Sequence, residues 1–220
     1  GDIGRPVALG EGPAADAFVV LAVTADDGQR KAFDAFLVEA GTPGLALQPS
    51  AGAGSGPISA PAAAVLAPLQ HAGLQFEACA VPAGSRLGPG GTAFDRIARP
   101  VRVVEDALLT SALVGAMHAE LDALARWLRP THPAPALLRR LGALRLELDA
   151  LQLVADQAAR RLEAEGPGAG LAKFNAGSRR LLERWQGEFE SLAATFDDLG
   201  ETIASLSRDI RCVLGIARSV

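Results

Sequence analysis

Apolar residues change their spacing once along this chain, near residue 98. Before that point they form short runs or alternate with polar residues, which predicts strands. After it they recur every three or four residues, which predicts amphipathic helices. The sequence therefore predicts an α+β fold in which a small antiparallel β-domain, residues 1–92, is followed by a C-terminal four-helix bundle, residues 93–220.

The β-domain is predicted to contain a hairpin. Residues 17–24 are a nearly continuous apolar run rich in valine, which is typical of a buried strand, and residues 33–39 form a second strand. The turn residues Asp26-Asp27-Gly28 lie between them. An extended run resumes at 45–47, and residues 74–81 alternate as a half-buried strand should.

Two glycine-rich segments separate these elements. Residues 49–61 contain no GxGxxG or Walker spacing and no helix follows their glycines directly, so we expect a solvated loop there in preference to a phosphate-binding one. Residues 84–92 are expected to be the linker to the helical domain.

Four helices are predicted in the second domain. The first, residues 105–128, carries one continuous apolar stripe and ends before the prolines at 130 and 133. The others are expected at 136–165, 171–194 and about 199–214. The short connections between long helices favour antiparallel neighbours.

Charge and composition exclude some classes of function. A net charge of −4 and a pI near 5.4 argue against a nucleic-acid-binding surface. Cys79 and Cys212 have no CxxC or metal-ligand spacing, so we expect two reduced thiols in a cytoplasmic protein. The three histidines are isolated, which predicts no metal site. We expect no membrane span and no signal peptide, and the initial glycine suggests that residues upstream of Gly1 are missing.

Five strings are similar, in order, to segments of the acyl-CoA dehydrogenase family. Residues 15–24, 35–47 and 74–88 resemble strands of its middle β-domain. Residues 114–125 resemble the helix that opens its C-terminal domain, and Arg208-Asp209 resembles its late Arg-Asp pair. The similarity covers most of the chain, from about residue 14 to 215.

This resemblance implies two parts of a three-domain flavoenzyme, a barrel-like middle β-domain and a C-terminal helical domain. The family's N-terminal domain would precede Gly1. Such enzymes oxidise an acyl-CoA thioester: a carboxylate removes the α proton, and the β hydrogen leaves as hydride to FAD. The implied partners are acyl-CoA, FAD, and a second copy in a homodimer or a homologous chain.

The catalytic base is the first departure from the family. The usual glutamate lies nine residues after the arginine of the Arg-Asp pair, and counting from Arg208 gives Ala217, which cannot accept a proton. A minority of the family places the glutamate nine residues before the helix's Val-Gly pair, and counting back from Val114 gives Glu105. The alternative is that Glu105 is an ordinary exposed glutamate at a helix start, favoured there by the helix dipole.

The flavin contacts are the second departure. The resemblance implies an arginine near residues 131–135, where this chain has Thr131. It also implies a glutamine and a glycine cluster beginning eighteen residues before Arg208. This chain has Glu190 at the start of that segment, followed by Ala193, Ala194 and Phe196. Glycines let the backbone approach a cofactor, and side chains at the same positions fill that space. Which residues of this chain would hold FAD is unknown from its sequence.

Three functions remain open. The chain is an FAD-dependent acyl-CoA dehydrogenase-like protein, a degenerate family member that acts as a structural or partner subunit, or an unrelated α+β binding domain. We expect the chain as given to lack acyl-CoA dehydrogenase activity and to bind FAD weakly or not at all. The resemblance also predicts a dimer through an apolar face of the helical part. The candidates for that face are Trp127, Leu128, Trp185 and Phe189, and the alternative is that these residues are simply core.

Overall fold

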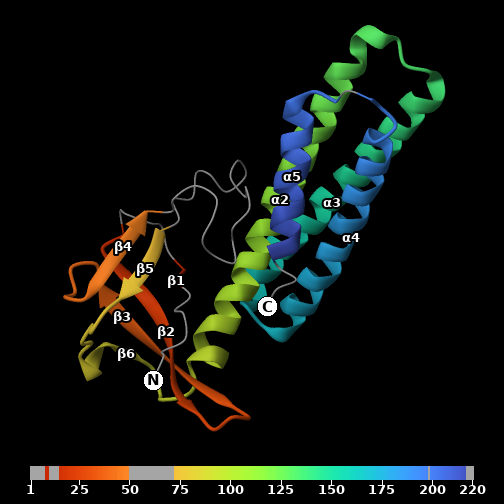
Figure 1. Cartoon of the computed structure of the whole chain (residues 1–220). Coiled ribbons are helices and arrows are strands. Elements are labelled where there is room, and N and C mark those ends of the chain that lie inside the picture. The colour runs from red at the N-terminus through yellow and green to blue at the C-terminus, as the bar shows by residue number, and fades with distance from the viewer. Residues whose placement is uncertain (1–7, 10–14, 50–71, 198, 217–220) are drawn as a thin grey trace. The chain divides into compact units, whose positions relative to one another are not determined.

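The computed structural model describes residues 8–9, 15–49, 72–197 and 199–216 (Figure 1). The loop expected at 49–61 therefore lies outside the described residues except for Pro49. The chain divides into two compact units, and the division falls between Arg102 and Val103. Each unit has its own core and is described by itself.

A four-stranded antiparallel sheet forms most of the first unit. Its strands are β1 (Ala8–Leu9), β2 (Ala17–Asp26), β3 (Lys31–Glu39) and β6 (Arg86–Leu87), in the spatial order β1-β2-β3-β6. The predicted hairpin is the β2–β3 pair, with a register shift between Val23 and Ala25. Asp27 fixes the hairpin's turn, because the Asp27 carboxylate accepts hydrogen bonds from the backbone N–H groups of Arg30 and Gln29. These hydrogen bonds lower the pKa of Asp27.

Strand β6 corrects the prediction that residues 84–92 form only a linker. Buried Asp34 on β3 accepts a hydrogen bond from the Gly91 N–H and lies 3.9 Å from the Arg86 guanidinium. These contacts hold residues 86–91 against β3, and a short 3-10 turn, η1 (Ala83–Ser85), precedes them. Sequence spacing alone does not reveal such a strand, because its two residues are too few to show alternation.

The remaining strands of this unit, β4 (Leu45–Pro49) and β5 (Ala72–Phe76), form a separate two-stranded antiparallel sheet. Strand β5 ends earlier than the predicted strand at 74–81, and Ala78 has a positive φ of 47°. Side chains from both sheets surround the buried Phe18, Val20 and Val38. The small antiparallel β-domain is thus present among the described residues as two sheets.

The predicted helices are all present, with shifted ends. They are α2 (Arg99–Leu128), α3 (Pro135–Glu165), α4 (Ala169–Ala193) and α5 (Glu201–Ile216). A π-helical segment, η2 (Phe94–Ala98), leads into α2, and a 3-10 turn, η3 (Arg129–Thr131), follows it. Helix α2 begins six residues before the predicted start, and it contains Pro100 in its first turn, where proline is tolerated.

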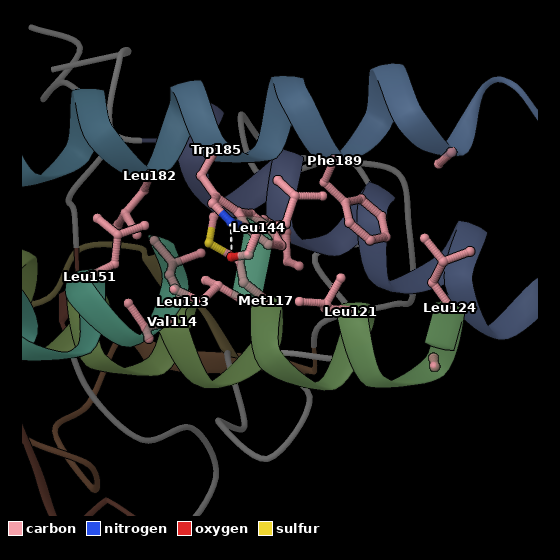
Figure 2. Packing of buried hydrophobic residues seen from close by; sticks show 14 of the residues in the cluster. Leu113, Val114, Met117, Leu121, Leu124, Leu144, Leu151, Leu182, Trp185 and Phe189 are labelled. Carbon is pink, nitrogen blue, oxygen red and sulfur yellow. Dashed lines mark hydrogen bonds between the residues drawn. The ribbon is translucent and has the colours of Figure 1, made fainter. Parts of the chain in front are cut away.

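All four helices contribute to one hydrophobic core (Figure 2). The predicted stripe of α2 supplies Leu113, Met117 and Leu124, which are almost completely buried. The Trp185 indole N–H donates to the Leu144 carbonyl at 3.0 Å, linking α4 to α3. Leu181, which also fits the apolar spacing of α4, is exposed.

The predicted dimer face is wrong for most of its residues. Leu128, Trp185 and Phe189 are buried in this core, and Trp127 packs edge-on against Phe196 with ring centroids 5.4 Å apart. The alternative, that these residues are core, is correct for Leu128, Trp185 and Phe189, and Trp127 is partly buried against the same core.

One described segment, Phe94–Thr131, is long and apolar enough to cross a membrane by length and composition alone. The sequence expectation that no run has this length was therefore too strict. A helix buried in a protein core meets the same criteria, and Leu113, Met117 and Leu124 show that α2 contributes to such a core.

Candidate functional site

Glu105, the predicted base, lies half-buried in the second turn of α2. Because α2 begins at Arg99, Glu105 is its seventh residue and lies beyond the first turn, where the effect of the helix dipole fades. The interpretation of Glu105 as a dipole-favoured residue at the helix start therefore loses its support. Its role as a base stays a prediction.

A small pocket lies between α2 and α4, next to Glu105 in sequence. Its polar lining comes from Asp106 and Thr110 on α2 and from Asn175 and Arg179 on α4. The buried Asn175 side-chain amide donates to the Val103 carbonyl at 3.0 Å, while its own oxygen has no hydrogen-bond partner within the described part of the chain. A volume of about 130 Å³ is far below that of pockets that hold drug-sized ligands, so neither an acyl-CoA nor a flavin fits inside it.

A second hollow, of about 330 Å³, lies between α3 and α4. Its charged lining has both signs: Arg140 and Glu147 come from α3, and Arg184 and Glu188 from α4. Arg184 and Glu188 lie 4.0 Å apart across one helical turn. Its lining therefore carries two positive and two negative side chains and no excess of either charge.

Most of the positions at which the family resemblance implies flavin contacts make contacts within the helical unit, whereas Ala194 is exposed. The Thr131 hydroxyl donates to the Leu128 carbonyl at 2.8 Å and so satisfies the end of α2. Ala193 belongs to the hydrophobic core, and the Phe196 ring packs against Trp127. Glu190 binds the Arg211 guanidinium at 2.6 and 2.8 Å. These residues do not fit FAD in the way the family's arginine, glutamine and glycines would.

The Arg208-Asp209 pair is also structural among the described residues. Arg208 is exposed and pairs with Glu201 at 2.7 Å within α5, while Asp209 is buried. Ala217, the residue at the usual base position, lies outside the described residues. An alanine there still offers no group that can accept a proton.

The helical core contains a polar cluster that sequence reasoning missed. Glu120 on α2 is fully buried, and its Oε1 accepts hydrogen bonds from Gln186 Nε2 on α4, at 3.2 Å, and from the Ser207 hydroxyl on α5. Its Oε2 and the Gln186 side-chain oxygen are buried and have no hydrogen-bond partner among the described residues.

The pKa of Glu120 is raised to about 7, mainly by burial and to a smaller extent by the nearby Glu190 carboxylate. The hydrogen bonds from Ser207 and Gln186 act in the opposite direction. A sequence signal for this residue exists. Glu120 continues the helical spacing of Leu113 and Met117, so it is an acidic residue at a core position.

Metal binding has no support within the described ranges. They contain no group of three or more histidine, cysteine, aspartate or glutamate residues that could hold a metal ion. Of the histidines, His118 is half-buried on α2, His132 is exposed after η3, and His71 lies outside the described residues.

Solved structures share this arrangement of elements. Butyryl-CoA dehydrogenase from Megasphaera elsdenii matches with a TM-score of 0.73 and 20% identity over 96% of this chain and 54% of that chain. A dibenzothiophene monooxygenase from Paenibacillus sp. A11-2 matches with a TM-score of 0.61 and 18% identity, over 95% of this chain and 58% of that chain. A chain of the ChsE4-ChsE5 complex from Mycobacterium tuberculosis matches with a TM-score of 0.58 and 21% identity, over 96% of this chain and 59% of that chain.

These matches confirm the predicted resemblance at the level of the fold: the chain has the fold of the acyl-CoA dehydrogenases. It spans a little over half the length of the structures it matches. No protein-family model matches the chain, and no curated protein matches it. Because a dehydrogenase and a monooxygenase share the fold, the fold does not select one reaction.

Proposed function

We propose that this chain is a non-catalytic partner subunit with the acyl-CoA dehydrogenase fold. The observation that carries the proposal is the occupation of the family's flavin-contact positions by packing groups. Ala193 is part of the core, Phe196 packs on Trp127, and Thr131 satisfies the end of α2.

Titration of the purified chain with FAD tests this proposal. We expect no stoichiometric binding at micromolar flavin, measured by the quenching of flavin fluorescence and by retention of yellow colour after gel filtration. Tight binding of one FAD per chain would contradict the proposal. An assay with butyryl-CoA and an artificial electron acceptor is then expected to show no turnover.

The second candidate function is FAD-dependent α,β-oxidation of an acyl-CoA, with Glu105 as the general base. It is favoured by the position of Glu105, which is half-buried and too far along α2 to be explained by the helix dipole. In this role the Glu105 carboxylate would accept the α proton of the thioester. The test compares turnover in Glu105→Gln with turnover in the control Glu163→Gln, which alters an exposed residue of α3. Loss of turnover in the first variant and its retention in the second would establish this function in place of the partner-subunit role.

We also propose that the chain pairs with a second copy or a homologous chain through α3. The proposal is supported by Leu138, Leu146 and Leu153, which are 53%, 71% and 65% exposed. Their spacings of eight and seven residues place them on one face of the helix, away from the core residues Leu144 and Leu148. One structural neighbour is itself a complex of two named chains.

The finer details of the fold belong to the same proposal. We infer that residues 1–92 correspond to a barrel-like middle β-domain and residues 93–220 to a four-helix-bundle C-terminal domain of the acyl-CoA dehydrogenase type. The two antiparallel sheets and the single core shared by α2, α3, α4 and α5 support this. A cytoplasmic location is supported by Cys79 and Cys212, which are both free thiols.

A further inference from the structure

We propose that Glu120, Gln186 and Ser207 form a pH-dependent switch that controls how firmly α5 is held against α2 and α4. The three residues come from three helices, since Glu120 lies on α2, Gln186 on α4 and Ser207 on α5. Both hydrogen bonds converge on one oxygen of the Glu120 carboxyl group. The cluster therefore joins the three helices at a single titratable group.

The geometry favours the protonated carboxyl group. The second oxygen, Oε2, is buried and accepts no hydrogen bond from the described residues, so an ionised carboxylate would leave part of its charge without a partner among them. A proton on Oε2 removes that charge. The pKa of Glu120 is raised to about 7, mainly by burial, so the carboxyl group ionises near neutral pH.

The charged surroundings of Glu120 act in the same direction. Glu190 on α4 raises the pKa of Glu120 through its negative charge, and it is itself bound by Arg211 on α5. Gln186 Nε2 donates to both carboxylates, at 3.2 Å each. Ionisation of Glu120 therefore adds a second negative charge beside Glu190, on the side of the core that α5 covers.

In this switch, loosening of α5 lets water reach the ionised carboxylate. The Ser207 hydroxyl contacts Glu120 from α5, and Ser207 is half-buried. Movement of α5 would break this hydrogen bond and expose Oε2 to solvent. Raising the pH through neutrality should thus increase the local opening of α5.

Hydrogen exchange of the α5 backbone amides between pH 5 and pH 8.5 tests the switch. After correction for the intrinsic exchange rate, we expect the opening constant to rise with pH by up to about tenfold per unit between pH 5 and pH 7 and then level off. In Glu120→Gln the opening constant should be independent of pH, and the matched control Glu163→Gln should behave as the parent chain does. A flat profile in the parent chain, or an unchanged rise in Glu120→Gln, would overturn the proposal.

Two further substitutions should shift the pH midpoint of this rise in opposite directions. These tests do not depend on whether Glu120→Gln folds. Ser207→Ala removes a hydrogen bond that favours the ionised form, so the midpoint of the rise should move to higher pH. Glu190→Gln removes a charge that disfavours ionisation, so the midpoint should move to lower pH. Shifts in the same direction, or no shift in either variant, would show that Glu120 does not control α5.

Discussion

At the scale of single residues, Glu120 has the clearest consequence for stability. Its folded-state pKa of about 7 exceeds the reference value of 4.5, so the folded chain holds a proton more tightly than the unfolded chain. The free energy of unfolding should therefore fall as the pH rises from 4.5 to 7, by at most about 3 kcal/mol from this group, and stay level above. Urea denaturation of the parent chain and of Glu120→Gln at pH 5 and pH 8 measures this.

The expected result is a difference between the two chains that changes with pH. Glu120→Gln should gain stability relative to the parent on going from pH 5 to pH 8, because glutamine does not ionise. Carboxylates elsewhere titrate equally in both chains and cancel in the comparison. A constant difference across that range would show that Glu120 has an ordinary pKa.

Two glycines with nearly the same φ allow a second test at this scale. Gly44 has a φ of 86° and Gly28 a φ of 83°, so alanine is strained at either position. A Cβ at Gly44 would also clash with the backbone of Glu77 and Cys79, whereas a Cβ at Gly28 meets open space. We expect Gly28→Ala to cost about 1 kcal/mol and Gly44→Ala clearly more, measured as free energy of unfolding. Equal losses would show that the close approach at Gly44 is not structurally important.

At the scale of elements, hydrophobic spacing identified most strands and helices correctly. The β2–β3 hairpin and the four helices follow from local patterns, because one face of each is buried. What the pattern did not reveal depends on distant contacts. Strand β6 is held by Asp34 on another strand, and the Glu120 cluster joins residues more than sixty positions apart. Leu181 matched the helical spacing but lies at the edge of the buried face and is exposed.

Helix α2 offers a prediction about its two faces. Leu124 is completely buried, whereas Leu108 is 61% exposed on the same helix. Leu124→Ala should destabilise the chain by about 2–5 kcal/mol through lost burial and a cavity, while Leu108→Ala should stay within about 0.5 kcal/mol of the parent. Thermal and urea unfolding of both variants measure this. A large loss in Leu108→Ala would mean that Leu108 is covered in solution.

At the scale of the whole molecule, the fold was predictable and the candidate site was only partly so. The resemblance read from the strings at 15–24, 35–47 and 74–88 led to the same fold that the solved structures share. The departures at Thr131, Ala193 and Phe196 were visible in the sequence, but their physical meaning was not. Only the coordinates show that these side chains pack against Leu128, the core and Trp127.

Assembly is where sequence and structure diverge most, and the reason is physical. Apolar residues at helical spacing can face either the chain's own core or another chain, and spacing alone does not distinguish the two. Trp185 and Phe189 proved to be core, while exposure marks Leu146 and Leu153 of α3. If pairing uses α3, charge placed on its outer face should prevent it, and charge on an equally exposed leucine elsewhere should not.

We therefore expect light scattering at micromolar concentration to give the parent chain a dimeric mass. Leu146→Glu and Leu153→Glu should each shift the mass toward the monomer, because a carboxylate within an apolar interface loses its hydration without gaining a partner. Leu108→Glu, at 61% exposure on α2, is the matched control and should leave the dimer intact. Circular dichroism would verify that all three variants keep their helical content. A monomeric parent chain would exclude self-association through α3. Light scattering of a mixture with a homologous chain would then show whether the two different chains pair with each other.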